Sequence, residues 1–328
     1  MTRLAEDPLP REVVAEPSRL AAGLVFAVIS AGTFGMSGAL ARPLLDAGWS
    51  AGAIVLVRVL IGAVVLLPAA LVALRGRWRA LRRNAGMILV YGAVAVAGTQ
   101  FCYFSAVQYM QVGPALLIEY TAPVAVVAWQ WVRHGQRPGP LTVVGAGVAA
   151  VGLVLVLDLL SGADLDPAGV LWALAAMIGA AMYFVMSADG DNGLPPIALA
   201  SGGLLVGAAA LGLAGLVGVL PMHTAHDAVT YAGSTVDWWV PMVLLGVVTA
   251  AAPYATGIAA SRRLGSRLAS FVALLEVVSA VLWAWLLLDQ LPRAVQLAGG
   301  LLILAGVVVV KLGERATARP AGAPTPPG

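Results

Sequence analysis

Three charged side chains stand inside stretches of sequence that are otherwise apolar: Arg58, Glu119 and Glu276. A charged group in hydrocarbon costs about 2.5–3.5 kcal/mol on insertion scales, and it usually faces a protein interior or a water-filled cavity. Arginine keeps its proton at any accessible pH, so Arg58 needs a partner. Charges of both signs can hold the two ends of a small zwitterion, and a carboxylate can also exchange a proton. What they do depends on where the surrounding helices place them.

The composition is that of a membrane protein. The chain has 328 residues, of which 60% are hydrophobic and 11% charged, and its mean hydropathy is +0.92. Soluble domains are about 45–50% apolar and about 25% charged. The basic residues sit in short loops and do not cluster on one folded face, so we expect a lipid bilayer and a small molecule as partners, and no nucleic acid. With one cysteine, Cys102, and no metal-ligand spacing, we expect no disulfide, metal or cofactor.

Ten apolar runs are long enough to be membrane-spanning helices, each of which needs roughly 20 residues. The sequence therefore predicts an all-α polytopic membrane protein with ten spans. They lie near 20–41, 51–74, 85–108, 112–132, 140–158, 168–188, 195–220, 238–260, 266–288 and 294–312. Residues 1–19 are of mixed charge, unlike a signal peptide, and 313–328 form a Pro/Ala-rich tail that we expect to be disordered.

The distribution of basic residues predicts the orientation. If the N-terminus is cytoplasmic, the cytoplasmic segments hold sixteen of the nineteen Lys and Arg residues, the outer loops hold only Arg42 and Arg293, and Arg58 lies within a span. Basic residues favour the cytoplasmic side. We therefore expect a multi-pass protein of the cell membrane with both termini in the cytoplasm.

The depth of the three charged residues follows from a helical rise of about 1.5 Å per residue. Arg58 and Glu119 each lie seven residues from the outer end of their span, so both are roughly 10 Å below the outer boundary. They could form a buried ion pair that only fixes the packing, or they could take part in transport. Glu276 lies near the midplane and has no arginine of its own, because Gly203 occupies the position that matches Arg58. Its neighbours form a stripe of small residues, which also fits close helix packing.

Prolines and polar faces add further candidates. Pro123 removes the backbone hydrogen bond to the carbonyl of Glu119, and Pro253 does the same for Thr249, so we expect a helix bend at each proline. Polar residues at helical spacing predict the walls of a cavity, although each alone fits a helix–helix hydrogen bond as well. The candidates for substrate binding or coupling are Arg58, Glu119, Glu276, Gln100, Tyr103, Tyr183, Tyr254 and Thr33.

An internal repeat divides the chain. When the chain is aligned with itself at an offset of 154 residues and without a gap, identical residues fall in register. Trp129 and Trp131 align with Trp283 and Trp285, Gly145 and Gly152 align with Gly299 and Gly306, and a Gln-x-Pro motif aligns with its second copy. Five spans per repeat is an odd number, so the second half must be inserted upside down. We expect repeats at 20–158 and 159–312. Inverted repeats are typical of secondary transporters, whose substrate sites lie near the midplane.

Over residues 20–312 the chain resembles the EamA family of the drug/metabolite transporter superfamily. LLIEYTAPVAVVAW resembles the fourth span of the threonine/homoserine exporter group, and PYATGIAASRRLGSRLASFVALLEVVSAVLWAWLLLDQL resembles its eighth and ninth. Two departures are Glu276-Val277 in place of the family's Glu-Pro, and Asp289-Gln290 in place of its Gly-Glu. The resemblance implies alternating access around a central cavity, with an amino acid or a related metabolite as cargo and export as the direction.

Other functions remain as alternatives. One is an uptake permease for a different small metabolite or drug-like solute. A membrane-embedded enzyme is disfavoured because the histidines (134, 223 and 226) lie in or beside loops and no span carries a catalytic pair. A channel is disfavoured because the sequence shows no re-entrant loop or charge ring, and no nucleotide-binding motif supports an ATP-driven pump. The substrate, coupling ion and oligomeric state are left open.

Overall fold

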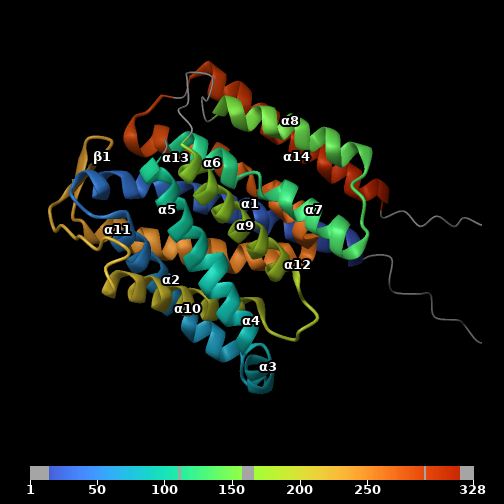
Figure 1. Ribbon diagram of the computed structural model, residues 1–328, viewed down its shortest axis with the longest axis horizontal. Helices are drawn as coiled ribbons and strands as arrows, with labels where there is room; N and C mark the ends of the chain where they lie inside the picture. The colour runs from blue at the N-terminus through green and yellow to red at the C-terminus, as the bar shows by residue number, and fades with distance from the viewer. Residues whose placement is uncertain (1–14, 110–111, 157–165, 292, 318–328) are drawn as a thin grey trace, which may run out of the picture.

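The computed structural model describes residues 15–109, 112–156, 166–291 and 293–317, which are mostly helical (Figure 1). The first half contains α1 (Ala15–Asp46), α2 (Ala51–Ala73), α3 (Trp78–Arg83), α4 (Ala85–Val90), the π-helix η1 (Tyr91–Gly98), α5 (Thr99–Tyr109), α6 (Val112–Glu119), α7 (Ala122–His134) and α8 (Pro140–Val156). The second contains α9 (Pro167–Ala188), α10 (Pro196–Leu216), α11 (Trp239–Gly246), the π-helix η3 (Val247–Ala251), α12 (Ala252–Ala273), α13 (Leu275–Leu288) and α14 (Ala294–Thr317).

The protein is a multi-pass membrane protein. By length and composition, seven helical stretches among the described residues can cross a bilayer, and two shorter apolar helices occupy Pro140–Leu155 and Leu275–Leu288. Large apolar side chains on the outer faces are exposed, including Val25, Leu171 and Leu301, as lipid-facing positions must be. The seven differ from the predicted ten because three predicted spans do not reach the necessary length as single helices. The fourth is divided into α6 and α7, the fifth is the short helix Pro140–Leu155, and the ninth is divided between the end of the stretch Trp239–Ala273 and the short helix Leu275–Leu288. Of the predicted tails, residues 1–14 and 318–328 lie outside the described residues.

Two of the predicted spans are broken where their glutamates lie. The fourth ends one helix at Glu119 and begins the next at Ala122, and the hydroxyl of Thr121 donates to the carbonyl of Ile118 (2.6 Å) at the break. In the second half, Leu274 separates α12 from α13, with Glu276 in the first turn of α13. Such interruptions are tolerated at membrane depth only where protein or a cavity meets the freed backbone groups.

The repeat is visible in the backbone as well as in the sequence. With the offset of 154 residues, the π-helix Tyr91–Gly98 falls on 245–252, which contains the second π-helix, Val247–Ala251. The C-caps correspond too. Gly135 ends α7 with φ 68°, and Asp289 ends α13 with φ 54°. This left-handed conformation favours glycine but admits aspartate, so Asp289 can occupy the position that Gly135 holds in the first half.

Glycines set the closest helix crossings. A Cβ on Gly145 of α8 would lie 2.7 Å from the carbonyl oxygen of Gly306 on α14, and one on Gly152 would lie 2.6 Å from that of Gly299. Because 145 corresponds to 299 and 152 to 306, the two halves exchange the same contact. Figure 1 shows α8 and α14 side by side, and both pack against α12 and α13 in one buried cluster. Small residues allow backbones to approach in this way in membranes.

The prediction of an all-α chain is incomplete. A short antiparallel hairpin, β1 (Val229–Tyr231) and β2 (Ser234–Val236), lies in the segment between α10 and α11, with Val229 opposite Val236. In Figure 1 it lies at the same side of the molecule as the end of α1. Two three-residue strands are too short to leave a clear alternating pattern in the sequence.

Candidate functional site

A cavity of about 480 Å³ lies among the helices, with walls from α1, α2, α5, α6, α7, α9, α12 and α13. It brings together most of the residues that the sequence singled out. Among its lining residues are Arg58, Gln100, Tyr103, Glu119, Pro123, Tyr183, Tyr254 and Glu276. Helices from both halves of the repeat therefore contribute charged or polar groups to one cavity.

Arg58 is the buried cation of this cavity. It lies on α2 and is only 7% exposed, and its guanidinium carbon lies 5.1 Å from the centre of the Phe34 ring. Its Nε and Nη2 atoms are buried and form no hydrogen bond. Within the described residues no salt bridge joins Arg58 to Glu119, so the buried ion pair considered from the sequence is not formed in this structure. Arg58 and Glu119 match in depth, but of the two carboxylates it is Glu276 that interacts electrostatically with Arg58.

The acids of the cavity form a small group at the two helix breaks. Glu119 is the last residue of α6, and Glu276 is the second residue of α13. Their charges act on each other, and a side-chain hydrogen bond joins Glu276 to Tyr120. Tyr120 was not among the predicted site residues. Its position directly after Glu119, at a break caused by a proline-containing segment, is the signal that could have identified it.

Aromatic rings form another wall. The rings of Phe34 and Tyr254 are 5.6 Å apart, Tyr183 meets Tyr254 edge-on at 5.8 Å, and Tyr183 meets Phe184 edge-on at 5.0 Å. The sequence identified the tyrosines by their hydroxyl groups but missed the phenylalanines. Phe34 lies one helical turn from Ser30 and Ser37, so its spacing on the polar face of α1 could have revealed it. This wall offers apolar contact surface beside the charged groups.

Thr33 and Pro253 lie outside the lining of the cavity. The hydroxyl of Thr33 donates to the carbonyl of Ile29 in its own helix (2.8 Å), which satisfies it locally. Pro253 is the second residue of α12, directly after η3, and its carbonyl accepts a hydrogen bond from Ser30 (3.0 Å). Pro123 does line the cavity, as the second residue of α7. A proline at the start of a helix loses no hydrogen bond, so the chain there restarts a helix.

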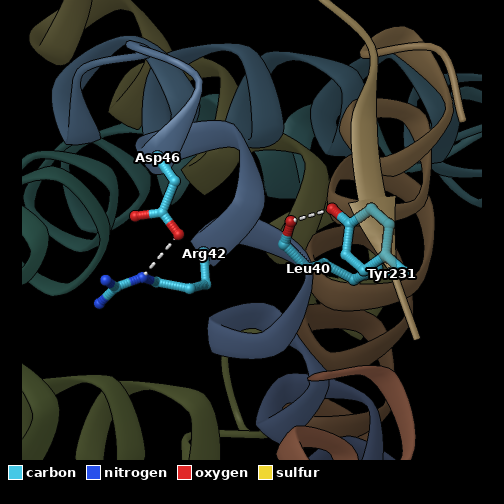
Figure 2. Close-up of polar contacts among 4 residues, drawn as sticks. All are labelled: Leu40, Arg42, Asp46 and Tyr231. Carbon is cyan, nitrogen blue, oxygen red and sulfur yellow. Dashed lines mark hydrogen bonds and ion pairs between the residues drawn. The ribbon is translucent and has the colours of Figure 1, made fainter. Parts of the chain in front are cut away.

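The cavity extends to the surface at the end of α1. Arg42 and Leu45 line it there, and the Arg42 side chain, 64% exposed, pairs with Asp46 at 3.0 Å (Figure 2). Beside this mouth, the hydroxyl of Tyr231 on β1 donates to the carbonyl of Leu40 (2.6 Å). Burial raises the pKa of Tyr231, so the hydroxyl keeps the proton that it donates. The hairpin is thereby fastened to α1 at the rim of the cavity.

At the opposite side of the molecule, hydrogen bonds join segments from the two halves. The Gln130 amide on α7 donates to the hydroxyl of Ser266 on α12 (2.7 Å). The Asn84 side chain, before α4, donates to the carbonyl of Asn192 (3.0 Å), which precedes α10. Arg262 of α12 reaches the carbonyl of Leu194 in the same connection. These contacts join the two halves at the end of the molecule that lies away from Arg42.

The described residues contain no group of three or more His, Cys, Asp or Glu side chains that could hold a metal ion. The chemistry that this cavity offers is recognition: one buried guanidinium, that of Arg58, a second guanidinium at the rim, that of Arg42, two carboxylates, tyrosine hydroxyls and aromatic faces. Ser261 adds a buried hydroxyl on the wall that forms no hydrogen bond. Such a set suits a small molecule with both polar and apolar parts.

Comparison with known proteins agrees with this architecture. The model of the EamA-like transporter family matches residues 21–158 and again 167–312. The chain is 25% identical over 246 residues to the uncharacterized inner membrane transporter YicL of Salmonella typhimurium, an alignment that covers 73% of this chain and 77% of that one. It is 28% identical over 207 residues to an uncharacterized transporter of Archaeoglobus fulgidus, covering 63% of this chain and 70% of that one.

A solved crystal structure of a protein 22% identical in sequence has the same fold, with a TM-score of 0.71, covering 91% of this chain and 99% of that one. The family model matches both halves of the chain and covers most of its length. These matches point to a transporter and not to an enzyme. This chain belongs to the EamA-like transporter family of the drug/metabolite transporter superfamily.

Proposed function

We propose that this protein is a secondary active transporter that moves a small polar metabolite, such as an amino acid, by alternating access around the cavity. The observation that carries the proposal is that Arg58, Glu119 and Glu276 line one cavity of about 480 Å³. Charges of both signs in a water-accessible cavity suit a zwitterion, and an exchangeable proton on one acid would couple transport to the proton gradient. Export is the proposed direction because of the resemblance to the threonine/homoserine exporter group.

The proposed topology is ten spans in two inverted halves, 20–158 and 159–312, with both termini in the cytoplasm. Exchanged contacts support the inversion. Gly62 on α2 lies against Gly246, and a Cβ there would be 3.3 Å from its carbonyl oxygen; Gly207 on α10 lies against Gly92 at the same 3.3 Å. Since Gly246 corresponds to Gly92, and α2 corresponds to α10, each half offers the other the same surface. The positions of the basic residues support the orientation.

The structure also suggests which state it represents. The cavity reaches the surface near Arg42, in a segment that the basic-residue pattern places outside. Hydrogen bonds such as that from Gln130 to Ser266 hold the opposite end together. We infer an outward-facing conformation, from which transport requires the contacts at the cytoplasmic end to break and the rim at Arg42 to close.

Transport by the purified protein in lipid vesicles tests the proposal. We expect at least one of the twenty L-amino acids to exchange, with flux that responds to an imposed pH gradient. Glu276→Gln and Glu119→Gln should each abolish or strongly reduce flux, whereas Asp227→Asn, which changes an exposed outer-loop acid, should not. If no amino acid is transported by folded protein, the substrate class is wrong.

Normal flux in both glutamine variants would remove the acids from the site. The direction is tested by accumulation in vesicles of known orientation, and net uptake towards the cytoplasmic face would favour the permease alternative. A role for Glu119 in packing alone would instead lower the stability of Glu119→Gln while the surviving protein transports normally.

A further inference from the structure

Arg58 is an unsatisfied cation inside the cavity. It is 7% exposed, and two of its guanidinium nitrogens, Nε and Nη2, are buried without any hydrogen-bond partner. Its described contact is the face of the Phe34 ring, 5.1 Å away. Burying a charge without a direct counter-ion is costly, and buried donors are nearly always paired. The guanidinium is therefore kept in a position where an incoming anion would satisfy it.

The repeat shows that the fold does not require a cation at this place. Gly203 occupies the matching position on α10, and a Cβ there would lie 2.5 Å from the ring of Tyr91, which fills the space. The residue that corresponds to Tyr91 in the second half is Leu245, and it lines the same cavity as Arg58. One half of the pseudo-symmetric pair thus packs a ring on glycine, while the other half places a guanidinium in the cavity.

The two acids of the cavity lie on helices other than α2, which carries Arg58. Glu119 ends α6 and Glu276 begins α13, whereas Arg58 projects from α2. The charge of Glu276 acts on Arg58, yet within the described residues neither acid forms a salt bridge with it. Opposite charges that line one cavity but do not touch leave room between them, and they give that space a fixed polarity.

We propose that Arg58 is the carboxylate-binding subsite of the transporter and that it sets the orientation of the solute, whose cationic end points to Glu119 and Glu276. This inference rests on the proposed function and names its substrate class: zwitterions with a free carboxylate. A planar guanidinium fork matches a carboxylate with two parallel hydrogen bonds, which an amide or an amine cannot reproduce. The carboxylate draws the long, flexible Arg58 side chain away from the Phe34 ring and satisfies its free donors.

The test compares analogues that differ only in the carboxylate. Purified protein in vesicles is first loaded with each of the twenty radiolabelled L-amino acids in turn to find those that exchange. For the amino acid that exchanges fastest, the competitors are the unlabelled amino acid, its carboxamide and its decarboxylated amine. Hydrogen bonds to charged groups contribute about 1.5–3 kcal/mol, so we expect the carboxamide and the amine to compete about ten to a hundred times more weakly.

Variants assign this preference to Arg58. In Arg58→Gln the ratio between amino acid and carboxamide should fall close to one, and in Arg58→Lys, which keeps the charge but loses the fork, it should be intermediate. Arg263→Gln is the matched control, because the Arg263 guanidinium also lies over a ring, that of Phe26, but is not part of the cavity lining. Its ratio should equal that of the unaltered protein. If Arg58→Gln does not fold, the lysine variant and the analogue series still decide.

Each of the other possible outcomes refutes a specific part of the proposal. Exchange of an amino acid with equal competition by its carboxamide refutes the carboxylate subsite and leaves the proposed function intact. Discrimination that persists in the Arg58 variants shows that another residue binds the carboxylate. No exchange of any amino acid overturns the proposed substrate class, and this inference with it.

Discussion

The crossing of α8 and α14 gives a prediction that depends on two neighbouring glycines. A Cβ added at Gly145 would lie 2.7 Å from the Gly306 carbonyl oxygen and 2.8 Å from the Val310 backbone nitrogen. Backbone atoms cannot rotate away, so the two helices must separate to admit the methyl group of Gly145→Ala. At Gly147, two residues further along the same helix, a Cβ would meet no atom within 4 Å.

A comparison of Gly145→Ala with Gly147→Ala isolates the effect of helix packing on stability. Alanine is favoured over glycine inside a helix by about 1 kcal/mol, and both variants share that gain. Overpacking a close contact costs about 1–3 kcal/mol, and only Gly145→Ala incurs it. We therefore expect Gly145→Ala to be less stable than Gly147→Ala by about 1–3 kcal/mol. In the Gly145→Ala protein, a second substitution, Gly306→Ala, should lower the stability by less than it does alone, because the first substitution has already separated the helices.

Unfolding of the purified protein by SDS in mixed micelles, followed by helix content, gives the free energies for this comparison. Apparent melting midpoints provide a second readout. They are measured at one scan rate, because an irreversible transition has a midpoint that depends on the scan rate. Equal stability of the Gly145→Ala and Gly147→Ala proteins would contradict the close approach of α8 and α14. So would a stabilised Gly145→Ala protein.

Two further predictions concern the rim and the wall of the cavity. Tyr231→Phe removes the hydroxyl that donates to the carbonyl of Leu40, a loss of about 0.5–1.5 kcal/mol; amide hydrogen exchange in the hairpin should accelerate, and unchanged exchange would show that this bond does not hold it. In Gly257→Ala the new methyl group would overlap the hydroxyl of Tyr183, so flux should fall without loss of folded protein. Gly32→Ala, where a Cβ meets open space on the neighbouring helix α1, is the control, and equal flux in the two variants would argue against Tyr183 as part of the wall.

Much of the site could be predicted because intramembrane polar groups are few and each needs an explanation. Arg58, Glu119 and Glu276 stood out from their apolar surroundings, and the structure places all three on one cavity. Thr33 was selected by the same reasoning, yet its hydroxyl bonds within its own helix. Helical spacing identifies a shared face, but it does not say whether that face meets a cavity or whether the group is already satisfied locally.

Other features could not be predicted from spacing. Equal depth suggested that Arg58 pairs with Glu119, but depth fixes only one coordinate, and the rotation and separation of the helices decide which charges meet. The breaks at Tyr120 and Leu274 bring Tyr120 to Glu276, a contact between residues far apart in the chain. The spacing of Phe34 from Ser30 and Ser37 places it on the polar face of α1, but only the packing of α2 and α12 against that face brings Arg58 and Tyr254 to its ring.

The sequence by itself determined that the chain lies in a lipid bilayer, that it contains an internal repeat, and which few polar residues lie within its apolar spans. These follow from composition and periodicity, which are local properties of the chain. Only the tertiary structure decided that Arg58 stays unpaired over Phe34, that the acids gather at two helix breaks, and that a hairpin is fastened at the rim. Those outcomes depend on how separate helices pack, and that is set by contacts between residues distant in sequence.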